Sequence, residues 1–235
     1  MFASFEIGAI FNSMKNTSKS LTKTKRITIP ESISNHLRKQ ILIGEIHAGE
    51  PLRQELLAQQ FGVSISALRE ALKILEGEKL VRFLPNHGAE VMRLTAEEAL
   101  EIYEIRMMLE TGILALSIPK LKEEDFLRAE KILEEEASCH DPARYNEINS
   151  LFHEYLYEPA GNLRLLDMIH LLHNNVARYL VFYLDKMDFK DFSHSEHTAL
   201  LAACRERDVR KAKQVLKKHM TKACNLLVEY LKQHE

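Results

Sequence analysis

The chain has 235 residues, 46% of them hydrophobic, and a formal net charge of −2, so it is long enough to bury the cores of two domains. Its three cysteines lack close spacing, which excludes a disulfide framework and favours a reducing cytoplasm. No apolar run is long enough to cross a bilayer, and Glu6 interrupts the first apolar stretch, so we expect neither a membrane span nor a signal peptide.

The charges divide unevenly between the two ends of the chain. Residues 1–93 hold 13 Lys and Arg against 9 Asp and Glu, whereas residues 94–235 hold 19 against 25. A basic part joined to an acidic part fits a nucleic-acid-binding head on a body with another task. Because the positive excess is small, one copy should bind weakly, and we expect a homodimer on double-stranded DNA.

In chain order, residues 1–26 end in a polar, basic stretch rich in Ser and Thr, and we expect a flexible arm. The run 29–44 has apolar residues at helical spacing and Pro30 near its start, which predicts a helix. This helix would pack behind the two helices that follow it.

Two amphipathic runs joined by a tight turn lie between residues 51 and 78. The first can end at Gly62, which readily adopts the positive φ that stops a helix. Ser64 then suits the N-cap of a second helix. The spacing i, i+3, i+4, i+7 gives that helix one buried face at Leu68, Ala71, Leu72 and Leu75. Its opposite face carries Ser66, Arg69 and Lys73.

A short hairpin is predicted after the second helix, because apolar runs at 81–84 and 89–92 flank a Pro-Asn-His-Gly bend. The polar start of the second helix can enter a major groove while this wing follows the neighbouring phosphates. The whole stretch then has the outline of a winged helix-turn-helix. From spacing alone, a helical hairpin with a β-turn and no nucleic-acid role is the alternative.

Residues 52–91 resemble the DNA-binding domain of the GntR family of bacterial transcription regulators. The resemblance rests mainly on Gly62-Val63-Ser64, Arg69-Glu70-Ala71-Leu72 and Pro85-Asn86-His87-Gly88. With the helix face, it indicates DNA contacts at Ser64, Ile65, Ser66, Arg69, His87 and Gly88. Ile65 stands where the family usually has Arg, and Gln54-Glu55 where it commonly has Glu-Arg, so a relative's operator sequence does not transfer. An apolar side chain at position 65 can contact a thymine methyl instead.

After Arg93 the pattern is helical almost throughout. Thr95 and Glu98 form a capping box that begins a helix running to Pro119. We expect its inner face to carry Ala99, Ile102, Ile105, Met108 or Leu109, and Ile113. Further helices are predicted at 123–137, 142–157, 162–184, 192–205 and 208–232. About six helices joined by short turns make an antiparallel all-α bundle, so the fold class is mainly α.

Polar side chains on three of these helices can meet as a metal site. Asn149 and His153 lie one turn apart, and His197 and His219 lie on later helices. Three imidazoles and one oxygen donor suit a divalent ion such as Zn, Ni or Mn. The alternative is a set of ordinary core or surface histidines. His170 and His173 form a competing pair without an evident third ligand.

The C-terminal region resembles the all-helical FCD ligand-binding domain of the FadR subfamily. The resemblance is carried by Arg106, Leu109-Glu110, Phe152-His153, Gly161-Asn162, Glu196-His197 and His219-Met220. It implies that Asn149, His153, His197 and His219 bind a metal, with a neutral Asn149 in place of the family's Asp. It also implies a small carboxylate effector on the metal, held by Arg106 or Arg178. A salt bridge to a Glu is the alternative for each Arg.

These features predict a ligand-responsive DNA-binding regulator with a head at 27–93 and an effector-binding and dimerisation domain at 94–235. The effector would change how the two heads of a dimer are arranged. A metal-dependent hydrolase or ligand carrier with a vestigial head is the alternative, with Glu196 beside His197 as a base. No nucleophile and no acid/base pair is evident, so we expect no enzyme.

Overall fold

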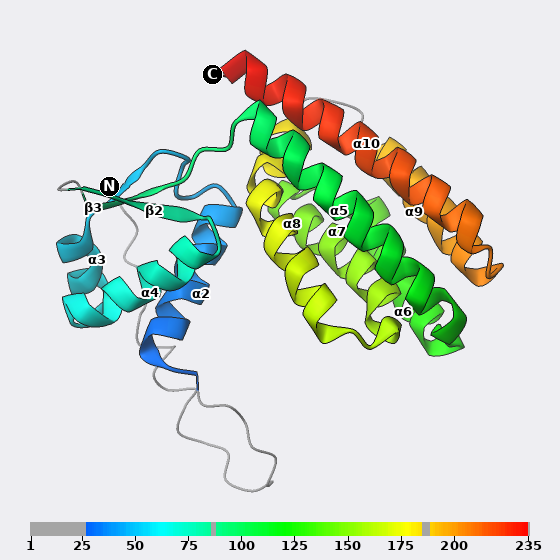
Figure 1. Cartoon of the computed structure of the whole chain (residues 1–235), viewed down its shortest axis with the longest axis horizontal. Coiled ribbons are helices and arrows are strands. Elements are labelled where there is room, and N and C mark those ends of the chain that lie inside the picture. The colour runs from blue at the N-terminus through cyan, green and yellow to red at the C-terminus, as the bar shows by residue number, and fades with distance from the viewer. Residues whose placement is uncertain (1–26, 86–87, 185–188, 235) are drawn as a thin grey trace, which may run out of the picture.

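The structure is a computed structural model that describes residues 27–85, 88–184 and 189–234. It has two separate hydrophobic cores, one built from residues between Ile33 and Val91 and the other from residues between Leu94 and Leu231. Figure 1 shows a small N-terminal part beside a bundle of longer helices. The predicted fold class, a winged helix-turn-helix followed by an all-α bundle, is confirmed.

Three helices form the N-terminal part: α2 (Ile29–Leu42), α3 (Gln54–Phe61) and α4 (Ile65–Gly77). α3 ends at Gly62, whose φ of 64° is left-handed. The Ser64 hydroxyl then caps α4 by accepting a hydrogen bond from the Ala67 amide at 3.2 Å. The four residues predicted to form the inner face of α4 are all buried, so its polar face points outward.

The sheet of the N-terminal part has three strands, β1 (Pro51–Leu52), β2 (Val81–Leu84) and β3 (Gly88–Val91), in the antiparallel order β1-β3-β2. β2 and β3 form the predicted hairpin, with Leu84 opposite Gly88. Gly88 has a φ of +82°, which glycine adopts without strain. The sequence did not predict β1 because two residues are too few to show an alternating pattern.

The bundle contains α5 (Ala96–Ser117), α6 (Glu123–Ser138), α7 (Pro142–Tyr157), α8 (Leu163–Leu184), α9 (Phe189–Arg205) and α10 (Val209–His234). Short 3-10 turns, η1 (Ile118–Lys120) and η2 (Glu158–Ala160), follow α5 and α7. All six predicted helices are present, although α9 begins three residues earlier than expected. α10 packs along α5 over much of its length (Figure 1). None of the helices in the described part of the chain has the length and apolar character needed to span a membrane.

The inner face of α5 differs from the predicted one. Ala99 and Ile113 are buried as expected, but Ile105 and Met108 are 43% and 69% exposed. The positions that point inward instead include Arg106 and Glu110, which form a buried ion pair. The expectation for Ile105 was therefore wrong because it assigned the inner face by apolar character alone. Of the alternatives Met108 and Leu109, it is Leu109 that packs against the core. α5 consequently has a second, outward-facing apolar side.

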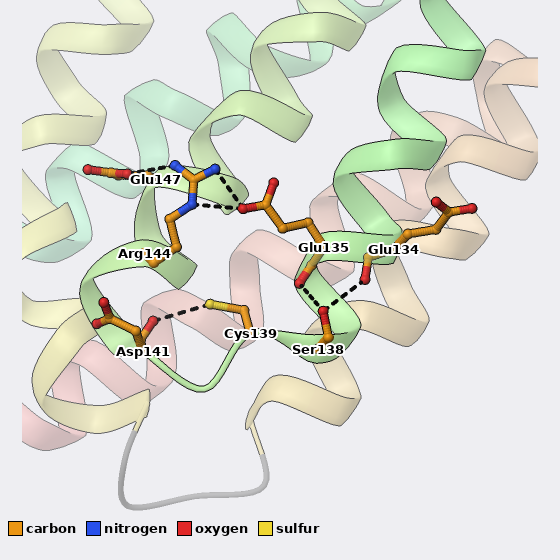
Figure 2. A network of polar contacts seen from close by, with 7 residues as sticks. All are labelled: Glu134, Glu135, Ser138, Cys139, Asp141, Arg144 and Glu147. Carbon is orange, nitrogen blue, oxygen red and sulfur yellow. Dashed lines mark hydrogen bonds and ion pairs between the residues drawn. The ribbon is translucent and has the colours of Figure 1, made fainter.

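The turn between α6 and α7 is fixed by polar contacts that Figure 2 shows from close by. Arg144 donates from Nε and Nη2 to Glu135 at 2.8 and 2.6 Å, and from Nη1 to Glu147 at 2.8 Å. The Cys139 thiol contacts the Asp141 carbonyl oxygen at 3.4 Å. These groups are partly exposed, so each ion pair contributes little on its own. Together they hold α6 and α7, which both carry residues of the site described next, in one relative position.

Candidate metal centre and DNA-binding surface

Three buried histidines from three helices of the bundle lie together. One ring nitrogen from each of His153 (α7), His197 (α9) and His219 (α10) lies within 4.8 Å of the others. Metal–nitrogen bonds are about 2.0–2.1 Å long, so nitrogens on one ion are at most about 4.2 Å apart. Small side-chain rotations would therefore bring all three onto a common ion. The structure thus brings together the three histidines that the sequence selected.

The hydrogen bonds around these rings decide which nitrogen each histidine can offer. Nδ1 of His197 lies 2.8 Å from a Glu136 oxygen, and Nδ1 of His219 lies 3.2 Å from a Glu196 oxygen. A carboxylate only accepts hydrogen bonds, so both Nδ1 atoms carry the proton. Nε2 of His197 is buried and has no hydrogen-bond partner in the described part of the chain. Both rings are left with an unprotonated Nε2, the form that binds a metal.

In His153, a hydrogen bond to a tyrosine places the proton on Nδ1, as the carboxylates do in His197 and His219. The Tyr157 hydroxyl donates to Glu110 at 2.8 Å and lies 3.3 Å from Nδ1 of His153. Because its one proton goes to the carboxylate, the hydroxyl oxygen accepts from Nδ1. Nε2 of His153 is then the nitrogen that carries the lone pair, as in the other two rings.

Burial keeps the His153 and His197 rings neutral. It holds the pKa of His153 well below its usual value, and the neighbouring His197 and His219 add to this effect. Burial also lowers the pKa of His197, because the hydrogen bond to Glu136 offsets the loss of solvent only in part. A metal has therefore few protons to displace at neutral pH, and the residues present fit a divalent ion.

A small cavity adjoins the histidines. It has a volume of about 20 Å³, close to the space of one water molecule. It is lined by Tyr103, Arg106, Glu110, Tyr145, Asn149, His153, His173, His219, Met220 and Ala223. Asn149 lies one turn before His153, so its carbonyl oxygen can serve as the fourth ligand or hold a bound molecule. An organic acid of several heavy atoms would need the cavity to open.

Arg106 lies in this cavity as a buried cation. Its Nε donates to Glu110 at 2.7 Å, and its guanidinium lies 4.9 Å from the centre of the Tyr103 ring. Burial opposes the charge, but Glu110 more than offsets it and raises the pKa of Arg106 above its usual value. Arg106 therefore forms a salt bridge to a Glu, which was the alternative, expected from the sequence, to binding an effector carboxylate. Its Nη atoms make no hydrogen bond to the described residues, so one edge of the fork is left for a ligand carboxylate.

His170 and His173, the competing histidine pair, point to different surroundings. His170 is exposed and lies 3.6 Å from Glu154, whereas His173 lines the cavity near Ser150. Burial and the nearby Arg106 lower the pKa of His173 to about 3. The side chain of Arg178, the other proposed carboxylate ligand, lies outside the described residues.

Residues that support the histidines were not predicted as part of a site. Glu136 bridges His197 and the half-exposed His194, and Tyr157 links His153 to Glu110. No spacing rule pairs a carboxylate on α6 with a ring on α9, so only the packing shows this contact. Glu110 was noted as part of the resemblance but without a role.

The outer face of α4 carries most of the proposed DNA contacts. Ser64, Ile65, Ser66 and Arg69 are all exposed. Ser66, Arg69 and Lys73 line a hollow of about 410 Å³ together with Glu70 and with Phe83 of β2. Arg69 and Lys73 form no ion pair with any described residue, so both cations are available for phosphates or base edges. The Ser64 hydroxyl, although it caps α4, can still donate its proton to a phosphate.

The wing lies close to the start of α3. A Cβ atom on Gly88 would come within 3.8 Å of the Gln54 side chain. His87 lies outside the described residues. Gly88, at the start of β3, and the α3 N-terminus therefore lie side by side, and the exposed Glu55 beside them would repel a nearby phosphate.

α8, a helix of the bundle, contacts the N-terminal part and the linker that follows it. Asn175 donates from Nδ2 to the carbonyl oxygen of Glu78, the C-cap of α4, at 3.2 Å. The Glu78 carboxylate is itself paired with Arg38 of α2 at 2.5 Å. The Tyr179 hydroxyl accepts from the Leu94 amide in the linker at 2.8 Å. His173, on the same helix, lines the cavity.

A winged helix-turn-helix joined to a helical bundle with a buried histidine centre defines a ligand-binding DNA regulator. Residues 30–91 match the bacterial regulatory proteins of the gntR family, and residues 101–222 match the FCD domain. The chain belongs to the GntR family and carries an FCD domain. It is a DNA-binding transcription regulator and not an enzyme, as the sequence predicted.

Named relatives are of the same kind. The chain is 30% identical to the uncharacterized HTH-type transcriptional regulator YdhC of Bacillus subtilis over 203 residues, which cover 85% of this chain and 91% of that protein. It is 26% identical to the HTH-type transcriptional repressor GlaR of Escherichia coli, over 78% of this chain and 89% of the repressor. A GntR-family regulator from Pseudomonas syringae has a solved structure with 32% identity and a TM-score of 0.56, covering 88% of this chain and 87% of that one.

Proposed function

We propose that residues 27–93 bind operator DNA as part of a homodimer and that residues 94–235 hold a divalent metal and a small organic acid that regulates this binding. The observation that carries the proposal is the convergence of three buried imidazole rings, whose Nδ1 atoms each face a hydrogen-bond acceptor, beside a buried Arg106. A DNA-binding regulator acts on the chromosome, so we place the protein in the cytoplasm.

The proposed metal ligands are His153, His197, His219 and the Asn149 oxygen. Nitrogen ligands with one oxygen suit Zn, Ni or Mn, and a bound ion would supply a positive centre for an anion. All four ligands are neutral, so the metal would keep its full charge. This favours a carboxylate effector that completes the coordination and contacts the open edge of Arg106.

The small cavity supports regulation through a change of shape. A volume of about 20 Å³ does not accommodate an organic acid, so binding requires the lining helices to move apart. α8 lines the cavity through His173. Through Asn175 it contacts the C-terminal end of α4, which is the proposed recognition helix. We propose that effector binding displaces α8 and so changes the position of α4. The effector acts only to the extent that it binds the opened arrangement more tightly.

The outward faces of α5 and α8 support a homodimer. Leu100, Ile105, Met108 and Leu116 of α5 and Leu163, Met168 and Leu171 of α8 are exposed. The two helices pack against each other, and Figure 1 shows them side by side. Seven exposed apolar residues on two neighbouring helices are more than a monomer usually leaves in water, and a second copy would bury them. Two heads would then bind two half-sites of one operator.

A mobility-shift assay tests the regulator proposal. The full chain is mixed with DNA from upstream of its own gene at moderate salt, with and without metal and a panel of small organic acids. We expect sequence-preferring binding that at least one acid changes. Binding that does not depend on sequence, or that no acid changes on the metal-loaded protein, would contradict the proposal.

A further inference from the structure

The first residue of the recognition helix has a side chain that the fold does not require. Ile65 begins α4 and is 49% exposed. It does not belong to the described apolar side chains that form or pack against the N-terminal core. A β-branched residue also lowers helix propensity slightly. Neither core packing nor helix formation therefore explains an isoleucine at this position.

The surroundings of Ile65 are polar and cationic. Arg69 lies one turn further along α4, and Ser66 and Lys73 lie on the same outer surface, where, among the described residues, Glu70 is the one carboxylate that lines the hollow against two cations. A patch of this charge does not suit an apolar protein partner, but it suits the phosphates of DNA. Ile65 is thus a single aliphatic contact on a surface built to approach a polyanion.

The chemistry of the major groove offers one apolar partner to such a side chain. The first residues of a recognition helix contact base edges, and of the four bases only thymine presents a methyl group in the groove. An isoleucine cannot donate a hydrogen bond to guanine or accept one from cytosine or adenine. It would leave those polar edges without a partner, which costs more than a lost contact.

We propose that Ile65 packs against the 5-methyl group of a thymine in each operator half-site and selects a T·A pair at that position. The inference deepens the proposed DNA-binding function and rests on it. Ser66 and Arg69, which follow Ile65 on α4, would supply the hydrogen bonds and phosphate contacts that fix the register of the helix.

The test begins by selecting preferred duplexes from a random pool with the full-length protein. Each thymine of the selected site is then replaced by deoxyuridine, which removes only the methyl group. We expect one position in each half-site at which affinity falls about fourfold, the effect of burying one methyl group. In the Ile65→Ala variant the same replacement should change affinity less than twofold, whereas Ile65→Val should keep most of the effect.

Two further variants sharpen the result. Leu56→Ala shortens a similarly exposed side chain, 50% exposed, on the neighbouring helix α3, and should leave the methyl effect unchanged. Ile65→Arg should move the selected base at the same position from thymine to guanine, to which Arg donates two hydrogen bonds. An unchanged methyl effect in Leu56→Ala together with a change from thymine to guanine in Ile65→Arg supports the contact between Ile65 and the methyl group.

Three outcomes would overturn the inference. A selected site in which no methyl group matters, or a methyl effect that persists in Ile65→Ala, would remove Ile65 from the groove while leaving the regulator function standing. A pool that yields no common sequence would overturn the proposed operator binding together with this contact.

Discussion

At the scale of single residues, the histidine centre makes a direct prediction about metal content. In the double variant His197→Ala, His219→Ala, two of three convergent imidazoles are lost. We expect bound metal to fall from about one ion per chain to nearly none, because one His and one neutral oxygen cannot hold a divalent ion tightly. Elemental analysis of the purified proteins measures this. His170→Ala is the matched control, since His170 is exposed and outside the cluster; equal metal in all three proteins would contradict the assignment.

Arg106 makes a second prediction at the same scale. Arg106→Lys keeps a positive charge beside Glu110, so the fold should be retained, but it removes the second edge of the guanidinium. Loss of a charged hydrogen bond should weaken carboxylate binding roughly ten- to hundredfold. The readout is the thermal shift produced by whichever acid stabilises the wild-type protein most. An unchanged shift would mean that Arg106 only pairs with Glu110.

The residues of this centre could be predicted from the sequence only in part. The proposed ligands His153, His197 and His219 were selected, because resemblance placed them and each lies on a predicted helix. Their partner Glu136 was not, because a contact between α6 and α9 depends on how the helices rotate in the bundle. Tyr157 lies one turn after His153 on α7, a spacing that the sequence does show but that was not used. A sequence pattern fixes which face of a helix is apolar, not which polar residues meet inside.

At the scale of one element, α8 should carry the effect of the ligand to the recognition helix. Asn175→Ala removes the hydrogen bond to the Glu78 carbonyl oxygen at the end of α4. One such bond contributes about 0.5–1.5 kcal/mol, so the ratio of operator affinities with and without effector should fall by about two- to tenfold. Effector affinity should change much less. Fluorescence anisotropy on labelled operator measures both quantities.

The neighbouring Asn174 gives the control for this prediction. It lies on the same helix, and among the described residues it forms no bond to the N-terminal part, so Asn174→Ala should leave the ratio unchanged. If both variants alter the ratio equally, general loosening of α8 is the cause. If neither does, the signal passes through another contact, such as the one between Tyr179 and Leu94.

Element boundaries followed closely from the sequence where local signals are strong. The capping box at Thr95 and the Gly62 stop lie where they were expected, because both act within one turn of helix. The two-residue β1 and the inner face of α5 did not follow. The first is held only by its pairing with β3, and the second depends on burying the Arg106–Glu110 pair.

At the scale of the whole molecule, the misassigned face of α5 becomes evidence for assembly. Ile105 and Met108 are apolar and exposed, and their helix α5 packs against α8, which carries further exposed apolar residues. Met108→Glu would place an unpaired carboxylate in the proposed interface, and burying such a charge costs several kcal/mol. We therefore expect the dimer to dissociate at least about tenfold more readily, as measured by sedimentation velocity over a concentration series.

The same variant tests whether DNA binding depends on assembly. A lone head with a small positive excess contacts one half-site, so operator affinity should fall together with dimerisation, while metal content and melting temperature stay near those of the wild type. Leu127→Glu is the matched control, because Leu127 is 51% exposed but lies on α6, which packs against α7 and α9 instead. A Met108→Glu protein that remains dimeric would exclude this face, whereas one that is monomeric and still binds the full operator tightly would show that a single head suffices.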